Sequence, residues 1–312
     1  MVTPIRIGTR DSPLATWQAS SVLHTLVANG HACSMVYIKS EGDLDLATPL
    51  YEMGVQGIFT RTLDAALLNN RIDIAVHSMK DVPTRLPAGL VQAAVLERAA
   101  VNDLLVYNKD LSFLENSETV ADIATSSIRR KAQWLHRFPR HRMHNLRGNM
   151  QTRLKKLHDE QWNGAIFAQA GLERIALRPA NSLVLDWMLP APAQGAIMVV
   201  ARQQDDKTIG TCESLNHADT AICTAIERSF LRGLNGGCST PVAALATIKG
   251  DEIHFRGNIY SPDGTENAEI EKSWQRTLQI DFGKEAAKEI LEHGGREIDL
   301  LIRAQSPTRD LS

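Results

Sequence analysis

The sequence predicts an α/β protein with two similar halves, followed by a small α+β domain. Over the first two-thirds of the chain, short apolar runs alternate with helical patterns, which is typical of sheets covered by helices. A strand, then hydroxyl residues and arginine, then a helix with a tryptophan occur near the start and again after residue 120. From Asp219 onward, a helical stripe is followed by strand-like runs divided by turns.

In the first half, a strand at 5–9 precedes Ser12 and Pro13, which are favoured at a helix start, and that helix continues to Gly30. The other expected elements are a strand at 36–39, a helix at 60–70 and a buried strand at 72–76. The last strand leads directly into His77, Ser78, Met79, Lys80 and Asp81.

The second half predicts strands at 102–107, 120–124, 143–146 and 165–168, with a helix from 128 to 136. An apolar run at 196–201 follows two prolines, and we expect it to return to the first half. The final part predicts a helix from 219 to a glycine stop at 236–237, strands at 242–248, 253–260 and 269–274, and a last helix at 281–293. The predicted domains are 1–97 with 196–215, 98–195, and 216–312.

Composition limits the possible function classes. The 312 residues suffice for two or three domains, and 43% hydrophobic with 22% charged residues argues against disorder. A net charge of −2 gives no global attraction to nucleic acid or an anionic membrane. Arg6 and Arg10 precede any apolar run, and no stretch approaches the roughly 20 apolar residues of a membrane span. We therefore expect a soluble cytoplasmic protein.

The four cysteines are Cys33, Cys212, Cys223 and Cys238. They form no CxxC pair and lack zinc-type histidine spacing, so neither a metal nor disulfides are expected. Cys238 differs from the other three because it follows Gly236 and Gly237 in a loop after a helix, where its sulfur is uncrowded. An accessible thiol near cations is nucleophilic, so a reactive role and a buried structural role both stay open for Cys238.

The strongest charge anomaly lies between residues 129 and 156, where there are ten basic residues and no acid. They are Arg129, Arg130, Lys131, Arg137, Arg140, Arg142, Arg147, Arg153, Lys155 and Lys156. The stretch predicts an anionic ligand, although pairing with acids elsewhere in the chain and a nucleic-acid partner remain alternatives.

The positions of the cations sharpen this prediction. Basic residues follow the carboxyl ends of predicted strands, and in open α/β sheets these ends converge on one crevice with the helix amino termini. The cations at these ends are Arg10, Lys80, Arg129, Arg130 and Arg147, with hydroxyls from Ser12, Thr125, Ser126 and Ser127. We predict a cleft between two domains that binds a ligand with several carboxylates.

Asp81 is an acid at the rim of this basic cleft. Neighbouring cations should keep it ionised, so it could stabilise a developing positive charge; a helix cap or a salt bridge is the alternative. For His77 in the same run, a structural role is favoured over a catalytic one.

Seven blocks of sequence appear together and in order: IGTRDSPLATWQA, DIAVHSMKDVP, ATSSIRR, NLRGNMQTR, AGLERI, PAPAQGA and LNGGCSTP. They resemble the signature set of the hydroxymethylbilane synthase (porphobilinogen deaminase) family and span most of residues 5 to 241. The resemblance implies three domains, two of them similar to the lobes of type 2 periplasmic binding proteins. It also implies a monomer whose dipyrromethane cofactor is thioether-linked to Cys238. Four porphobilinogen molecules would be added with loss of ammonia, and hydrolysis would release the linear tetrapyrrole.

The resemblance also implies residue roles, with Asp81 as the catalytic residue. Cofactor-binding positions would be Cys238, Lys80, Ser78, Thr125, Ser126, Ser127, Arg129, Arg130, Gln194 and Gly195. Substrate-binding positions would be Arg10, Ser12, Phe59, Arg147, Arg153 and Arg174. The chain departs from the family pattern before Phe59, since Glu41, Glu52 and Gln56 stand where relatives often carry basic residues.

Two other function classes compete with the enzyme. A two-lobed binding protein for a carboxylate ligand would explain the cleft but gives no purpose to Cys238 or Asp81. A polyanion or nucleic-acid binder would explain only the basic stretch, and it predicts affinity that falls steeply with salt.

Overall fold

The computed structural model describes residues 3–39, 60–116, 118–237, 240–277 and 280–305. These residues group into two compact units. The first unit contains the described residues of 3–39, 60–100 and 194–222, and the second contains those of 101–193 and 223–305. Each unit is described by itself below. The predicted division into three domains stays a prediction.

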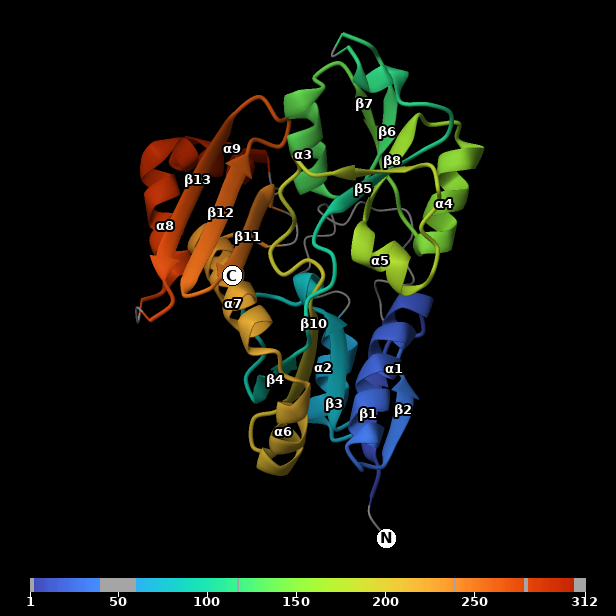
Figure 1. Cartoon of the computed structure of the whole chain (residues 1–312), viewed down its shortest axis with the longest axis vertical. Coiled ribbons are helices and arrows are strands. Elements are labelled where there is room, and N and C mark those ends of the chain that lie inside the picture. The colour runs from blue at the N-terminus through green and yellow to red at the C-terminus, as the bar shows by residue number, and fades with distance from the viewer. Residues whose placement is uncertain (1–2, 40–59, 117, 238–239, 278–279, 306–312) are drawn as a thin grey trace. The chain divides into compact units, whose positions relative to one another are not determined.

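The first unit holds a five-stranded sheet, here called the first lobe (Figure 1). Its elements are β1 (Ile5–Thr9), α1 (Pro13–Ala28), β2 (Cys33–Tyr37), α2 (Arg61–Leu68), β3 (Ile74–Ser78), the 3₁₀ turn η2 (Met79–Asp81), β4 (Leu90–Val95), β10 (Ile197–Arg202), α6 (Asp206–Cys212) and the 3₁₀ turn η4 (Glu213–Leu215). The strand order is β2-β1-β3-β10-β4. Helices α1 and α2 cover opposite faces of this sheet. Val22 and Leu26 of α1 pack with Ile7 of β1. Leu63 of α2 lies beside Gly8, the next residue of β1, which faces the other side.

The second unit holds a matching sheet, here called the second lobe. Its elements are β5 (Asp103–Tyr107), the 3₁₀ turn η3 (Ser112–Leu114), β6 (Asp122–Ala124), α3 (Ile128–Arg137), β7 (Arg142–His144), α4 (Met150–Asp159), β8 (Gly164–Ala168), α5 (Gln169–Arg174) and β9 (Ser182–Leu185). The order is β7-β6-β8-β5-β9.

The two sheets have the same spatial arrangement of strand directions, which confirms the predicted similarity of the two halves. In the first lobe β1 lies between the parallel strands β2 and β3, and in the second lobe β6 lies between the parallel strands β7 and β8. In each sheet an antiparallel strand comes next in the order. That antiparallel strand is β10 in the first lobe and β5 in the second. The predicted return of the run at 196–201 is also confirmed, because β10 pairs with β3 and β4.

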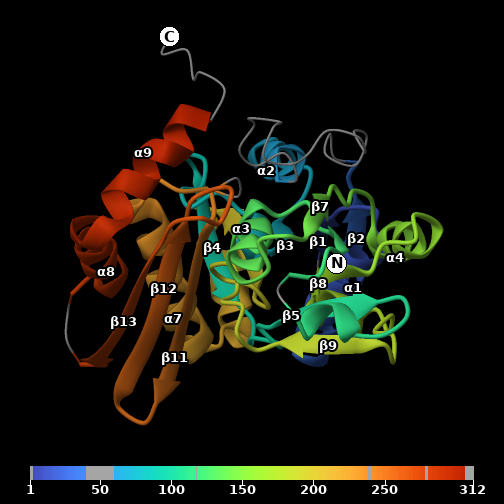
Figure 2. The same cartoon turned by 90° about the horizontal axis from the view of Figure 1, so that it is seen from above.

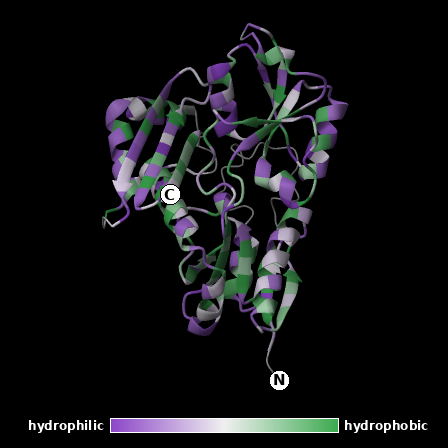
Figure 3. Ribbon diagram, viewed as in Figure 1, coloured by the Kyte–Doolittle hydropathy of each residue, from purple (hydrophilic) through white to green (hydrophobic). Residues whose placement is uncertain are grey.

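The remainder of the second unit is the small α+β part that the sequence predicted. It comprises α7 (Ala218–Gly233), which begins in the first unit, β11 (Val242–Lys249), β12 (Glu252–Tyr260), β13 (Asn267–Gln275), α8 (Phe282–Ile290), the π-turn η5 (Leu291–Gly295) and α9 (Arg296–Gln305). The three strands form an antiparallel sheet, and α8 lies beside β13 in both views (Figure 2). Figure 3 shows β13 banded in alternating colours, as expected of a strand with one buried face, whereas β3 and β10 are more uniformly hydrophobic.

Several predicted boundaries were wrong by a few residues. β2 begins at Cys33 rather than at 36, and β3 extends to Ser78, so that His77 belongs to the strand. The prediction also missed β4, β9 and α6, and it placed the last helix end at 293. At that point His293 and Gly294 leave helical geometry, but α9 continues the chain in helical form.

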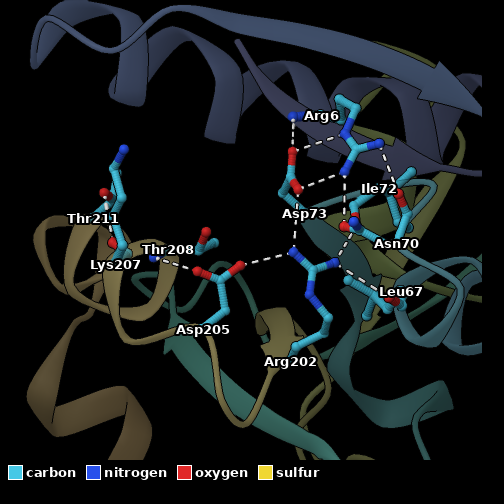
Figure 4. A network of polar contacts seen from close by, with 10 residues as sticks. All are labelled: Arg6, Leu67, Asn70, Ile72, Asp73, Arg202, Asp205, Lys207, Thr208 and Thr211. Atoms are coloured by element: carbon cyan, nitrogen blue, oxygen red, sulfur yellow. Dashed lines mark hydrogen bonds and ion pairs between the residues drawn. The ribbon is translucent and has the colours of Figure 1, made fainter. Parts of the chain in front are cut away.

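An ion network joins three segments of the first lobe at the amino end of β3 (Figure 4). Arg6 on β1 donates to Asp73 from its Nε at 3.0 Å and its Nη2 at 2.8 Å, and Arg202 on β10 donates to Asp73 at 3.2 Å and to Asp205 at 2.7 Å. Burial opposes ionisation of Asp73, but the hydrogen bonds from Arg6 and Arg202 outweigh it and lower its pKa to about 2. This network stabilises the edge opposite the predicted site.

Among the residues that the structure describes, no helix is both long and apolar enough to span a membrane.

Candidate active site

The predicted site residues of the first lobe gather where its strands end. This first-lobe set consists of Arg10, Ser12, Ser78, Lys80, Asp81, Gln194 and Gly195. β1 ends at Thr9 and β3 ends at Ser78, and antiparallel β10 begins at Ile197, which pairs with Ser78. All members therefore lie at one edge of one sheet. The sequence predicted this position for Arg10, Ser12, Lys80 and Asp81 from the ends of the strands.

The two serines of this set are held by local hydrogen bonds. Ser12 caps α1, because its Oγ accepts from the amide of Ala15 at 3.3 Å. The Ser78 hydroxyl and the Gln18 amide bond each other: Gln18 Nε2 donates to Ser78 Oγ at 2.9 Å, and Ser78 Oγ lies 3.2 Å from Gln18 Oε1. Gln18 is almost fully buried, so this pair joins α1 to the end of β3. The sequence analysis did not single out Gln18.

Lys80 and Gln194 meet within the first-lobe set. Lys80 Nζ donates to Gln194 Oε1 at 3.3 Å, and Arg98 Nε donates to the Gln194 carbonyl at 2.8 Å. Gly195 follows with a φ of +86°, and a Cβ at this position would lie 2.7 Å from the Ala99 carbonyl oxygen. The chain therefore requires glycine where the two crossing segments of the first unit approach each other.

His77 is buried beside this edge. Burial, and secondarily the positive charge of Arg10, lower the pKa of His77 to about 3. The imidazole is therefore neutral at physiological pH, which agrees with the structural role expected for it.

Asp81 is half-buried at the end of η2. Across the described ranges, neither a hydrogen bond nor an ion pair to its carboxylate is found; the neighbouring Lys80 turns to Gln194 instead. The alternatives of a helix cap or a salt bridge to Lys80 therefore find no support in the geometry.

The predicted site residues of the second lobe lie at the equivalent sheet edge. This second-lobe set consists of Thr125, Ser126, Ser127, Arg129, Arg130, Arg147, Arg153 and Arg174. Ser127 caps α3, accepting from the Arg130 amide at 3.5 Å, and Thr125 Oγ1 accepts from the Ser127 amide at 3.2 Å. Ser126 Oγ donates to the Leu146 carbonyl at 2.9 Å.

Arg129 and Arg130 form a buried cluster with Asp103, the first residue of β5. Arg129 Nη2 lies 2.6 Å from one carboxylate oxygen of Asp103, and Arg130 Nη2 lies 2.7 Å from the other. Burial opposes ionisation of Asp103, but the two guanidiniums outweigh it and hold its pKa well below the usual range. The cluster keeps one net positive charge at the start of α3, because two cations share one anion.

The other arginines of this set come from three different segments of the chain. Arg147 is buried after β7, and Arg153 on α4 donates from Nε to the Gly148 carbonyl at 2.7 Å. Arg174 ends α5, and burial lowers its pKa to about 10. A cation whose charge is disfavoured by burial gains stability from a bound anion.

Much of the basic stretch pairs with acids elsewhere, as the alternative interpretation held. Besides the cluster with Asp103, ion pairs join Arg140 to Glu118, Arg142 to Asp122, and Lys155 to Asp159. The excess charge of 129–156 in the sequence therefore overstates the charge available to a ligand.

Some predicted site residues lie outside the described residues, namely Cys238, Phe59 and the positions Glu41, Glu52 and Gln56. The described cysteines Cys33, Cys212 and Cys223 form no disulfide with one another. Within the described ranges, no group of three or more His, Cys, Asp or Glu side chains is arranged to hold a metal ion.

Two family models match the chain. "Porphobilinogen deaminase, dipyromethane cofactor binding domain" matches residues 5–210, and "Porphobilinogen deaminase, C-terminal domain" matches residues 221–292. These matches favour the enzyme over the binding protein and the polyanion binder.

Relatives with the same name align over nearly the whole chain. "Porphobilinogen deaminase, chloroplastic" is 41% identical in Oryza sativa, over 94% of this chain and 85% of the relative, and 42% identical in Pisum sativum, over 93% and 82%. "Porphobilinogen deaminase" of Syntrophomonas wolfei is 39% identical, over 94% of this chain and 97% of the relative.

The solved structures found by shape include periplasmic binding proteins. A periplasmic substrate-binding protein of an ABC transporter from Coxiella burnetii covers 72% of this chain and 96% of its own, at 15% identity and a TM-score of 0.43. The aliphatic sulphonate binding protein SsuA from Escherichia coli covers 74% and 70%, at 12% identity and a TM-score of 0.39. These likenesses are too weak to indicate a function, and the two five-stranded sheets are seen directly in the strand order of this chain.

Proposed function

Because the chain belongs to the porphobilinogen deaminase family, a family of transferases in tetrapyrrole biosynthesis, we propose how its residues carry out the reaction. Four porphobilinogen molecules are joined head to tail with loss of ammonia, and hydrolysis releases the linear tetrapyrrole hydroxymethylbilane. The observation that carries the residue assignment is the half-buried Asp81 carboxylate, which keeps clear of ion pairs within the described residues at an edge rich in cations.

Asp81 acts on the aminomethyl group of the substrate. The amine leaves from its protonated form: the carbon–nitrogen bond of the –CH2–NH3+ group breaks with its electron pair going to nitrogen, ammonia departs, and the positive charge passes to the substrate's pyrrole and methylene. A nearby ionised carboxylate stabilises that charge as it develops. The neutral His77 is unsuited to this role because its pKa of about 3 leaves it without a charge at physiological pH.

The cations of both sets bind the carboxylates of the substrate. We assign Arg10, Ser12, Arg147, Arg153 and Arg174, together with Phe59 outside the described residues, to substrate binding. Support comes from the placement of Arg10, Ser12 and Arg147 just past the carboxyl ends of β1 and β7. The first matched domain is named for the cofactor that it binds.

The described residues fit a cofactor with several carboxylates. The cluster of Arg129, Arg130 and Asp103 retains net positive charge, and the start of α3 adds amide donors. We propose that dipyrromethane is held by Lys80, Ser78, Thr125, Ser126, Ser127, Arg129, Arg130, Gln194 and Gly195. When bound, the cofactor supplies the pyrrole to which the first substrate is joined.

We propose that the cofactor is attached by a thioether to Cys238, on the basis of the Gly-Gly-Cys motif. The intact mass of the purified protein should exceed the sequence mass by two pyrrole units, and Cys238→Ser should lose this increment together with activity. Cys33→Ser is the matched control and should keep both. An unmodified protein with full activity would contradict the attachment but leave the proposed reaction standing.

A monomeric state and a cytoplasmic location also remain proposals. One relative is from a bacterium, and two are named chloroplastic.

A further inference from the structure

The turn between β12 and β13 of the C-terminal sheet rests on helix α3 of the second lobe. Both belong to the second unit. Gly264 in this turn has a φ of +77°, and a Cβ there would lie 2.4 Å from the Ala132 carbonyl oxygen and 2.8 Å from the His136 amide nitrogen. Both of these atoms belong to the backbone of α3, so neither can rotate away.

On the helix side of this contact, His136 binds the turn with its imidazole ring. Its Nδ1 donates to the Gly264 carbonyl at 2.9 Å. The bond requires a hydrogen on Nδ1, which is present in one neutral tautomer and in the protonated ring. Its ring meets Tyr260 of β12 edge to face, with centroids 5.2 Å apart. The turn and the helix are therefore joined by close packing, a hydrogen bond and a ring contact.

The turn is stiffened by its own hydrogen bonds. Ser261 Oγ donates to Asp263 at 2.6 Å and accepts from the Glu266 amide at 2.9 Å, while the Thr265 amide donates to Asp263 at 3.1 Å. The Gly264 amide closes the turn onto the Ser261 carbonyl at 2.9 Å. A turn braced in this way can resist a displacement of the helix that it touches.

Helix α3 is restrained at two further points. At its first turn, Arg129 and Arg130 are bonded to Asp103. In its middle, the Gln133 side chain bonds both backbone groups of Leu189, donating to the carbonyl at 3.0 Å and accepting from the amide at 2.8 Å. The β12–β13 turn adds a third restraint, toward the carboxyl end of the helix.

We propose that the β12–β13 turn is a positioning element for α3, with Gly264 and His136 as the positioning residues. A helix of ten residues moves as a nearly rigid rod about 15 Å long. A displacement at Ala132 and His136 therefore reaches Ser127, Arg129 and Arg130 at the other end. The inference rests on the proposed function in one respect, namely that the start of α3 binds cofactor carboxylates.

Gly264→Ala tests the proposal, and Gly250→Ala is the matched control. Gly250 lies in the turn between β11 and β12, also at positive φ (+61°), but with nothing within 4 Å of its added Cβ. Both variants place alanine in a left-handed conformation, and only Gly264→Ala pushes on the helix. Hydrogen exchange of the α3 amides should be at least tenfold faster in Gly264→Ala than in Gly250→Ala. The KM for porphobilinogen should rise several-fold in Gly264→Ala alone.

His136→Ala provides a second route if Gly264→Ala does not fold. It removes the hydrogen bond and the ring contact without adding a clash, and His158→Ala on α4, an exposed histidine, is its control. We expect faster α3 exchange and a raised KM in His136→Ala only. Equal α3 exchange in each variant and its control would overturn the inference, because this measurement does not depend on activity. A wild-type protein with no deaminase activity would instead overturn the proposed function.

Discussion

The two lobes share one arrangement of strands, but an acid at the site edge has different surroundings in each. In the first lobe, Asp81 follows the third parallel strand, half-buried and clear of ion pairs within the described residues, and α1 is joined to that strand by the neutral pair Gln18 and Ser78. In the second lobe, Asp103 lies fully buried between Arg129 and Arg130 at the start of α3. Of two lobes with the same strand arrangement, one thus has an acid available for chemistry and the other has an acid that holds cations.

The largest effect should come from Asp81→Asn. Removing the charge that stabilises the departing-ammonia step should lower kcat by about 10²- to 10⁴-fold, while the thermal midpoint stays near that of the wild type. The measurement is steady-state turnover of porphobilinogen beside a melting curve. Asp11→Asn, an exposed acid after β1 in the same lobe, should keep normal turnover. Near-normal rates in Asp81→Asn would contradict the claim that the acid of the first lobe takes part in the chemistry.

Asp103→Asn should instead damage the fold of the second lobe. It leaves two buried guanidiniums without their carboxylate, and breaking a buried ion pair in this way costs about 3–5 kcal/mol. Urea unfolding of both proteins gives the difference in the free energy of unfolding. Asp122→Asn is the control, since Asp122 at the opposite edge pairs with the exposed side chain of Arg142 and the partly exposed one of His144, and its substitution should cost about 1 kcal/mol. Equal costs would show that Asp103 is no more than an ordinary surface partner.

The smallest effect concerns the amino edge of the first lobe and is pH-dependent. Asp73 has a pKa of about 2 in the folded state against 3.8 for the free side chain, so its contribution is present above pH 3.8 and is lost as pH falls toward 2. We expect about 1–2 kcal/mol after allowing for partial exposure. Melting curves from pH 6 to 2 should show this loss in the wild type and a shallower loss in Asp73→Asn. Parallel curves would assign the acid sensitivity to other groups.

The sequence predicted the parts of the fold that depend on local pattern. Central strands such as β8 (Gly164–Ala168) are apolar at every position and were recognised, and the cap at Ser12 follows from its neighbour Pro13. The end of β3 was misplaced because His77 is polar, although burial keeps it neutral inside the sheet. α9 was missed because Gly294 and Gly295 are typical of a helix end, whereas here they form only a kink.

The site could be predicted only where it depends on strand ends. Arg10, Lys80 and Arg147 follow strands, so their edge was predictable without the fold. The pairing of Asp103 with Arg129 was not, because 26 residues separate the two and neither shows its partner in the local sequence. A possible signal was an acid opening an otherwise apolar strand, Asp103-Leu104-Leu105-Val106, since a buried carboxylate requires a cation.

The placement of β10 sets the order in which a nascent chain can fold. All five strands of the second lobe come from one continuous stretch, 103–185, and can pair as soon as it leaves the ribosome. The first lobe cannot, because β10 is inserted between β3 and β4 and is made only after residue 196. Until then β3 and β4 have exposed edges that other chains can pair with. The amino-terminal lobe is therefore the later one to be completed, and it depends most on protection from aggregation during synthesis.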